Sequence, residues 1–281
     1  MISAYDMFFL KLFHGMANGL FTFLFKLITL LGEKGILFFL LALVLMCFAK
    51  TRKFGICLFG AVACGALITN VILKDSVARI RPFEALDTYR QWWEAVGSPK
   101  EDGFSFPSGH VTAAAAGCTA VCLMKGKKWI APSVVWVLLM MIARNYLMAH
   151  YPTDVLAGAV IGIASGFIAW YITKFIYRFL RSKRGKKWAD FVLDYNVPVT
   201  VIGIPKLGFN IDLEKIGLRG EVEEEEDEAA FFDDDEEEDV EDEEEDEKPS
   251  RGIRLSKPQI RAPQIRLPSS KSTYVGKHEK H

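Results

Sequence analysis

The chain has 281 residues, of which 51% are hydrophobic, and a formal net charge of −1. Nearly all of the hydrophobic residues precede residue 181 and lie in long uncharged runs, which excludes an ordinary soluble domain and is typical of a helical membrane protein. The net charge describes no real surface, because it is the balance of a basic part (1–220), an acidic block (221–247) and a basic end (248–281).

The first apolar stretch, residues 4–31, is interrupted by charged side chains such as Asp6 and Lys26. Between Phe8 and Phe13, aromatic and leucine side chains recur at helical spacing, which is typical of an amphipathic helix at a membrane surface. Residues 20–31 are more uniformly apolar, so a short or tilted membrane span is the alternative for this second half.

Five later apolar runs predict membrane-spanning helices, at about 34–50, 54–77, 108–124, 129–149 and 155–180. Most of them are near the ~20 residues that cross the ~30 Å hydrocarbon core of a bilayer. Together with residues 20–31 they give five or six crossings, and we favour six. The expected fold class is all-α, a polytopic bundle of membrane helices followed by a disordered, charged C-terminal tail.

The last run carries a stripe of small residues, Gly158, Gly162 and Gly166, at four-residue intervals. Such a stripe allows two helices to approach closely. Packing within the chain is the more common use, and packing against a second copy, which would form a homo-oligomer, is the alternative.

Basic residues gather at one set of predicted span ends: residues 50–53, 125–128 and 178–187. An even number of crossings separates these clusters, so they share one face, and the positive-inside rule assigns that face to the cytoplasm. We therefore expect a multi-pass protein of the plasma membrane whose residues 74–106 and 150–154 are extracytoplasmic and whose tail is cytoplasmic.

The expected domains are a membrane domain (1–187), a short juxtamembrane segment that is interfacial or β-like (188–220), and a tail (221–281). The acidic block of the tail repels itself and is expected to be disordered. The sequence identifies no partner for the tail, and no nucleic-acid partner is expected.

Three polar clusters lie where predicted spans meet water: Lys74–Pro82 (KDSVARIRP), Phe106–His110 (FPSGH) and Arg144–Asp154 (RNYLMAHYPTD). All three fall on the extracytoplasmic side of the predicted topology, so they can converge. Hydrolysis of a phosphate ester without a metal needs cations, a nucleophile and an acid for the leaving group. The clusters contain all three, and we expect them to form one phosphate-binding site.

Lys74, Arg81 and Arg144 are the candidate cations. An arginine inside an apolar run is costly to bury, so Arg144 is expected to face a polar cavity. For Lys74 and Arg81 the alternative is that their side chains extend to the membrane surface without a binding role. Arg79 lies close by, and the sequence assigns it no role.

Ser108, Gly109 and His110 open a predicted helix, whose free N–H groups and positive dipole end can bind phosphate. An ordinary helix cap is the alternative.

His150 is a candidate nucleophile for attack on phosphorus. Asp154 is expected to accept the other ring N–H of His150 and also to be the N-cap of the last helix. Acidic residues of the loop, among them Glu101 and Asp102, are expected to be solvated. The chain has no metal-binding motif, so neither a metal nor another cofactor is expected.

These clusters resemble the three-part signature of the type-2 phosphatidic acid phosphatase and vanadium haloperoxidase superfamily: K-x6-R-P, P-S-G-H and S-R-x5-H-x3-D. The resemblance covers about residues 5–180, and Ala143 replaces the usual serine. It implies that His150 is the nucleophile, that Asp154 orients it and that His110 is the general acid. It also implies a phosphate cradle made of Lys74, Arg81, Ser108, Gly109 and Arg144.

The expected function is that of an integral-membrane, metal-independent phosphatase of lipid phosphates that works through a phosphohistidine. The substrates that the resemblance suggests are undecaprenyl diphosphate, phosphatidylglycerol phosphate and phosphatidic acid. One alternative is a phosphotransferase that passes the phosphoryl group to a sugar or a lipid. Another is a membrane scaffold that acts through the charged tail.

Overall fold

The structure is a computed structural model that describes residues 3–198, 201–204, 209–214 and 218. Its first helices are α1 (Ala4–Gly15), α2 (Gly19–Leu31), the short η1 (Glu33–Gly35), α3 (Ile36–Met46), α4 (Ala49–Ala66), the π-helical η2 (Leu67–Leu73) and α5 (Lys74–Val77). The later helices are α6 (Pro82–Ala85), α7 (Asp87–Ala95), α8 (Gly109–Lys125), η3 (Lys127–Trp129), α9 (Ile130–Tyr146), α10 (Pro152–Ser182) and α11 (Lys187–Asp194). Two short strands follow, β1 (Val201–Ile204) and β2 (Phe209–Asp212).

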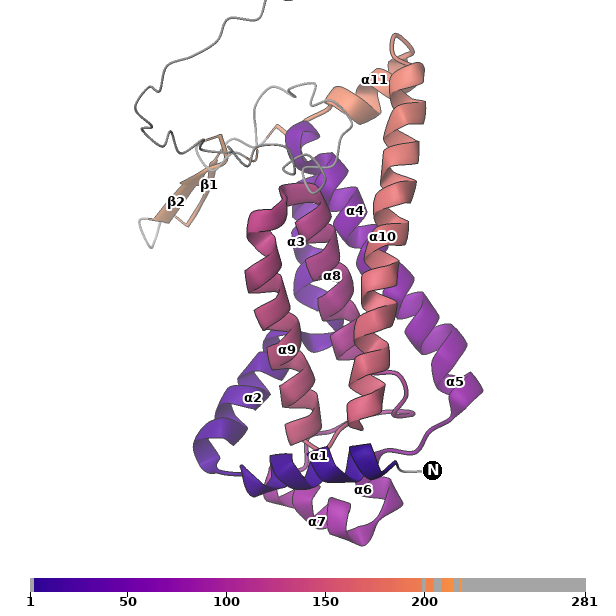
Figure 1. Ribbon diagram of the computed structural model, residues 1–281. Helices are drawn as coiled ribbons and strands as arrows, with labels where there is room; N and C mark the ends of the chain where they lie inside the picture. Colours follow the sequence, from indigo (N-terminus) through magenta and orange to yellow (C-terminus); the bar gives the residue numbers. More distant parts are fainter. Residues whose placement is uncertain (1–2, 199–200, 205–208, 215–217, 219–281) are drawn as a thin grey trace, which may run out of the picture. The chain divides into compact units, whose positions relative to one another are not determined.

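Helices α3, α4, α8, α9 and α10 form a bundle, with α1, α6 and α7 at one end and α11 at the other (Figure 1). Helix α8 is the centre of the bundle, since it packs against α4, α9 and α10. Its run of alanines is buried on most sides. Small side chains allow three neighbours to approach one helix, so the Ala-rich sequence accounts for the central position of α8. The predicted all-helical membrane bundle is confirmed.

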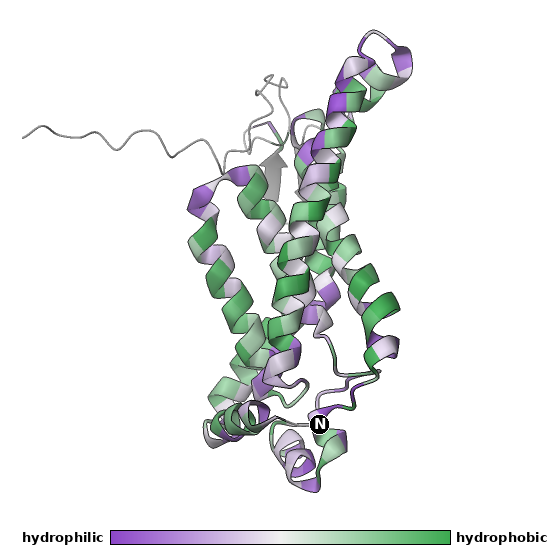
Figure 2. Ribbon diagram, turned by 45° about the vertical axis from the view of Figure 1, so that its right-hand side comes forward, coloured by the Kyte–Doolittle hydropathy of each residue, from purple (hydrophilic) through white to green (hydrophobic). Residues whose placement is uncertain are grey.

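In the described part of the chain, four helical segments are long and apolar enough to cross a membrane: Gly19–Met46, Ala49–Ala85, Lys127–Tyr146 and Pro152–Ser182. Figure 2 shows mostly hydrophobic residues along the middle of the long helices and more hydrophilic ones toward their ends. Helix α8 has 17 residues and is largely enclosed by its neighbours. Residues 19–31 and 36–46 belong to one of these apolar segments, Gly19–Met46. The number of crossings stays a prediction.

The ambiguous N-terminal stretch divides into two helices at Asn18. The side chain of Asn18 accepts a hydrogen bond from the backbone N–H of Phe21 at 2.9 Å and so caps α2. Helix α1 lies across the end of the bundle beside α6 and α7 (Figure 1) and exposes apolar side chains such as Phe8. This arrangement agrees with the surface helix that the sequence predicts for the first half.

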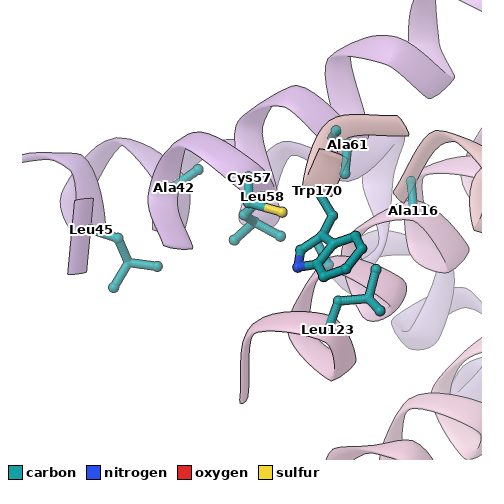
Figure 3. Close-up of a cluster of buried hydrophobic side chains, with 10 residues drawn as sticks. Ala42, Leu45, Cys57, Leu58, Ala61, Ala116, Leu123 and Trp170 are labelled. Carbon is teal, nitrogen blue, oxygen red and sulfur yellow. The ribbon is translucent and has the colours of Figure 1, made fainter. Parts of the chain in front are cut away.

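A cluster of buried apolar side chains joins α3, α4, α8 and α10 (Figure 3). The indole of Trp170 on α10 lies among Leu58 of α4 and Leu123 of α8 in this cluster. Trp170 lies 18 residues after Pro152, or about 27 Å along the helix axis. The apolar core therefore lies far along α10 from the polar first turn of that helix.

The glycine stripe of α10 faces α8. A Cβ atom added at Gly162 would lie 2.5 Å from the carbonyl oxygen of Thr112, and one at Gly158 would lie 2.8 Å from that of Ser108. The stripe thus serves packing within the chain, the more common of the two expected uses. Because α8 covers it, the stripe is not a surface on which a second copy can pack, and the expected homo-oligomer contact through these glycines is wrong.

We expect Gly162→Ala to lower the stability of the folded protein by about 1–3 kcal/mol, because the new methyl group would press on backbone atoms that cannot turn away. The matched control is Gly60→Ala on α4, where the nearest atom to an added Cβ, on Ala169, is an ordinary 3.4 Å away. Thermal unfolding in detergent micelles compares the two variants. Equal unfolding midpoints of the two variants would show that the close approach of the helices at Gly162 does not affect stability.

The segment after α10 contains both a helix, α11, and an antiparallel strand pair in which Val201 is opposite Asp212. The buried guanidinium of Arg52 donates hydrogen bonds to the carbonyl oxygens of Val192 and Tyr195, which fastens α11 to the start of α4. The described residues of 188–220 thus include strands at 201–204 and 209–212 after α11, and the interfacial or β-like character of the whole segment stays a prediction. The charged tail (221–281) lies outside the described residues.

Candidate active site

The three polar clusters meet at the end of the bundle that carries α1, α6 and α7. A cavity of about 330 Å³ lies among them, and its lining includes Lys74, Arg81, Gly109, His110 and His150. The other three predicted site residues, Ser108, Arg144 and Asp154, are fully buried. The structure therefore brings the predicted residues of all three clusters to one place.

The elements explain why these side chains converge. Lys74 directly follows the π-helical η2, and irregular turns of this kind occur often at functional sites. Ser108 is the N-cap of α8, so Gly109 and His110 occupy its first turn. Arg144 lies in the last turn of α9.

Arg81 is held inside the protein and is not a side chain that extends to the membrane surface. Its Nε and Nη2 donate to the carbonyl oxygens of Gly103 and Asp102 at 2.9 and 2.8 Å. Its Nη1 donates to the carbonyl oxygen of Ala149 at 2.9 Å. Only 2% of the residue is exposed, so its charge is fixed at the cavity.

Glu101 pairs with both buried arginines. Its Oε2 lies 3.3 Å from Arg81 Nη1, and its Oε1 accepts a hydrogen bond from Arg144 Nη2. The sequence-based expectation that Glu101 is solvated is wrong, because the loop before α8 folds inward and places this carboxylate between two guanidinium groups. This carboxylate therefore occupies one nitrogen of each arginine, where it would compete with a phosphate for these donors.

Several donors beside the cavity lack a protein partner. Within the described residues, the hydroxyl of Ser108 and the Nε and Nη1 of Arg144 are buried and make no hydrogen bond. Leaving a buried donor unsatisfied costs about 1–3 kcal/mol, more when the group is charged. A bound oxyanion would satisfy such donors, so this set fits a phosphate group.

His150 has a defined tautomer. Its Nδ1 lies 2.7 Å from the carbonyl oxygen of Ser105, which can only accept, so Nδ1 carries the proton and Nε2 keeps a free lone pair. Burial and the nearby cations Arg144 and Arg81 hold the pKa of His150 well below its usual range. The ring is therefore neutral at physiological pH, as a nucleophile requires.

Asp154 does not hold the His150 ring directly. Its Oδ2 lies 3.9 Å from Nδ1, which is longer than a hydrogen bond, and accepts instead from Ser105 Oγ at 2.5 Å. Ser105 thus lies between the carboxylate and the ring. Asp154 is also not the N-cap of α10, which is Tyr151. It is the third residue of the helix and accepts a hydrogen bond from the Tyr151 N–H at 3.0 Å. Both expectations for Asp154 are corrected in this way.

His110 faces a carboxylate that the sequence analysis missed. Its Nε2 lies 3.3 Å from Oε2 of Glu33, which belongs to the η1 turn between α2 and α3. The neighbouring Lys34 lines the cavity as well. Two adjacent charges inside an apolar stretch were the available signal, since such residues in a membrane segment often mark a functional site.

Lys100 and Asn70 also line the cavity, and neither was predicted. As for metals, the described residues contain no group of three or more His, Cys, Asp or Glu side chains that could hold an ion.

A family of known proteins matches the part of the chain that carries this site. The PAP2 superfamily matches residues 54–178, a range that contains all three clusters. The undecaprenyl-diphosphatase of Sulfolobus acidocaldarius is 31% identical over 154 residues, which cover 54% of this chain and 68% of that enzyme. The chain belongs to the PAP2 superfamily.

The chain is also similar to two other phosphatases, one known by its sequence and one by its crystal structure. Phosphatidylglycerophosphatase B of Haemophilus influenzae is 34% identical over 110 residues, which cover 36% of this chain and 43% of that enzyme. The chain thus matches less than half the length of this relative. The crystal structure of a transmembrane PAP2-type phosphatidylglycerolphosphate phosphatase from Bacillus subtilis is 26% identical, covers 62% of this chain and 87% of the other, and has a TM-score of 0.49.

Membership of the PAP2 superfamily confirms the predicted family, the phosphatase class and the membrane location. The PAP2 match begins in α4 and ends in α10. Helices α1, α2 and α3 precede it, and so do Asp6 and Glu33.

Proposed function

We propose that this protein is an integral-membrane phosphatase of lipid phosphates that works through a phosphohistidine on His150. The observation that carries the proposal is the state of His150: a buried, neutral ring whose Nδ1–H donates to the Ser105 carbonyl oxygen, at a cavity lined by cations that include the buried Arg81. The names of two PAP2 relatives, an undecaprenyl-diphosphatase and a phosphatidylglycerophosphatase, support a lipid phosphate as substrate.

Binding of the substrate begins at the cations. In the proposal, Lys74, Arg81 and Arg144 bind the phosphoryl oxygens, and the Ser108 hydroxyl and the Gly109 N–H at the start of α8 donate further hydrogen bonds. The phosphoryl group takes the place of the Glu101 carboxylate on the two arginines. These donors then stabilise the charge of the pentacoordinate transition state.

The reaction takes place in two steps. His150 Nε2 attacks phosphorus, the P–O bond to the lipid breaks, and His110 gives its proton to the leaving oxygen. Water then attacks the phosphohistidine, His110 takes a proton from that water, and the P–N bond breaks to release phosphate and neutral His150. Glu33, at 3.3 Å from His110 Nε2, lies where it can stabilise the charged ring.

The proposed side of the membrane follows from charge. Basic residues at 50–53, 125–128 and 178–187 belong to the end of the bundle opposite the site, and the positive-inside rule assigns them to the cytoplasm. The cavity then opens on the extracytoplasmic side, and the tail is cytoplasmic.

A substrate panel tests the proposed function. Purified full-length protein in detergent is given undecaprenyl diphosphate, phosphatidylglycerol phosphate and phosphatidic acid, with and without EDTA, and released phosphate is measured. We expect release from at least one of them at the same rate with EDTA. A lack of release from all three would contradict the proposal, and a new phosphorylated product on addition of glycerol would favour the phosphotransferase.

Glu101→Gln is expected to strengthen inhibition by vanadate about tenfold, which corresponds to about 1.4 kcal/mol. The reason is that a neutral amide competes less than a carboxylate for Arg81 and Arg144. The control is Glu94→Gln, an exposed residue of α7. If Glu101→Gln weakens vanadate inhibition, Glu101 holds the arginines in place and does not compete with the anion.

A further inference from the structure

Arg79 joins the carboxylate of Asp154 to the N-terminal helix. Its Nη1 donates to Asp154 Oδ1 at 2.5 Å and to Thr153 Oγ1 at 2.7 Å, and its Nη2 donates to Asp6 Oδ2 at 2.8 Å. The guanidinium carbon lies 3.9 Å from the centre of the Tyr151 ring. One arginine therefore contacts the first turn of α10 and a carboxylate of α1 at the same time.

Asp6 is an inward-facing acid on an otherwise surface-lying helix. It is 1% exposed, and its Oδ1 accepts from the backbone N–H of Thr153 at 3.1 Å and from Thr153 Oγ1 at 2.9 Å. The Oδ2 of Asp6 is the atom that receives Arg79. Helix α1 is thus fastened by several hydrogen bonds to the residue that precedes Asp154.

The same contacts continue to the nucleophile through Ser105. The Ser105 N–H donates to the carbonyl oxygen of Arg79 at 2.7 Å, and its hydroxyl donates to Asp154 Oδ2 at 2.5 Å. Its carbonyl oxygen accepts the Nδ1 proton of His150 at 2.7 Å. Arg79 therefore holds Ser105 both through its own backbone and through Asp154.

We propose that Arg79 and Asp6 are positioning residues for the nucleophile. They fix Asp154 and Ser105, and through the Ser105 carbonyl they fix the orientation and tautomer of His150. The N-terminal helix, which precedes the PAP2 match, is thereby part of the catalytic apparatus. This inference rests on the proposed function of His150.

The geometry calls for an arginine at position 79. Two buried carboxylates on different helices are bound by separate nitrogens of one planar group, and the same group stacks on Tyr151. A lysine carries the charge but offers one nitrogen and no planar face, so it can replace this group only in part. An ionised Asp154 without a cation partner would be costly in its fully buried position.

The test compares Arg79→Gln, Arg79→Lys and Asp6→Asn with Arg90→Gln, an exposed arginine of α7, in full-length protein. A misplaced reacting group can cost ~10²-fold in rate, so we expect kcat to fall about 100-fold in Arg79→Gln and about 10-fold in Asp6→Asn. Arg79→Lys should lie between Arg79→Gln and the wild type, and Arg90→Gln should keep the wild-type rate.

A comparison of kcat with the vanadate inhibition constant separates a positioning role from a defect in folding. Because Lys74, Arg81 and Arg144 stay in place, the vanadate inhibition constant should change by less than about threefold while single-turnover formation of the phosphoenzyme slows with kcat. Rates are normalised to the folded fraction, measured by size-exclusion chromatography.

A folded Arg79→Gln protein with a kcat within threefold of the wild type would overturn the inference. If Arg79→Gln does not fold, the isosteric variant Asp6→Asn takes its place as the test. A folded Asp6→Asn protein with a kcat within twofold of the wild type would then overturn the inference. A wild-type protein that releases phosphate from none of the lipids and forms no phosphoenzyme would instead overturn the proposed function.

Discussion

His150→Ala should abolish turnover. We expect kcat to fall by at least about 10⁴-fold, as in other enzymes that lose the nucleophile of a covalent mechanism. The neutral Nε2 of His150 is the only nitrogen in the proposal that attacks phosphorus, and the cations alone offer no covalent route. Phosphate release and bound phosphoryl group are measured together on labelled lipid substrate, and both should be absent.

His278→Ala is the control for this prediction, since it removes a histidine that lies well beyond the PAP2 match at residues 54–178. It should keep the wild-type rate. If His150→Ala retains more than a tenth of wild-type turnover, another group attacks phosphorus and the assignment of the nucleophile is wrong.

His110→Asn should lower kcat on lipid substrates by about 10²–10⁴-fold, the usual contribution of a general acid or base. The loss should depend on the leaving group. A nitrophenyl phosphate releases an acidic phenol that needs no proton, so the first step should be nearly unaffected. The second step still lacks a base to deprotonate water, and phosphoenzyme should therefore accumulate on this substrate.

Rapid quenching after mixing with nitrophenyl phosphate measures that accumulation, together with the initial burst of phenol. Equal losses on the lipid and on the nitrophenyl ester, with no burst, would contradict a role for His110 in protonating the leaving oxygen.

The convergence of the three clusters could be predicted from the sequence because it depends on local features. Lys74, Arg81, His110 and His150 lie at the ends of apolar segments, and alternate crossings bring such ends to the same side. The glycine stripe gave a second local signal, since small residues at four-residue intervals indicate close helix packing wherever the partner helix lies.

Contacts between distant segments could not be predicted in this way. Glu101 is one of several acids in a polar loop, and only the folded path of that loop brings it to Arg144. Ser105 contributes a backbone carbonyl, which every residue has, so no side-chain pattern marks it as the group that orients His150.

The contacts that Asp6 and Glu33 make could not be predicted for a different reason. Asp6 and Glu33 precede the PAP2 match, and each lies in an apolar stretch where a lone acid indicates either a surface position or a polar partner. The sequence does not name that partner. In the structure it is Arg79 for Asp6 and His110 for Glu33.

The central claim is that the phosphoryl group of the substrate is transferred to His150. The most direct measurement is to quench wild-type and His110→Asn protein during turnover of nitrophenyl phosphate under alkaline conditions, which preserve phosphohistidine. The phosphoryl group is then located by mass spectrometry of the peptide that contains residues 145–154. We predict a single phosphorylated residue, His150, at higher occupancy in His110→Asn. A phosphoryl group on any other residue, or phosphate release with no phosphorylated peptide in either protein, would contradict the account.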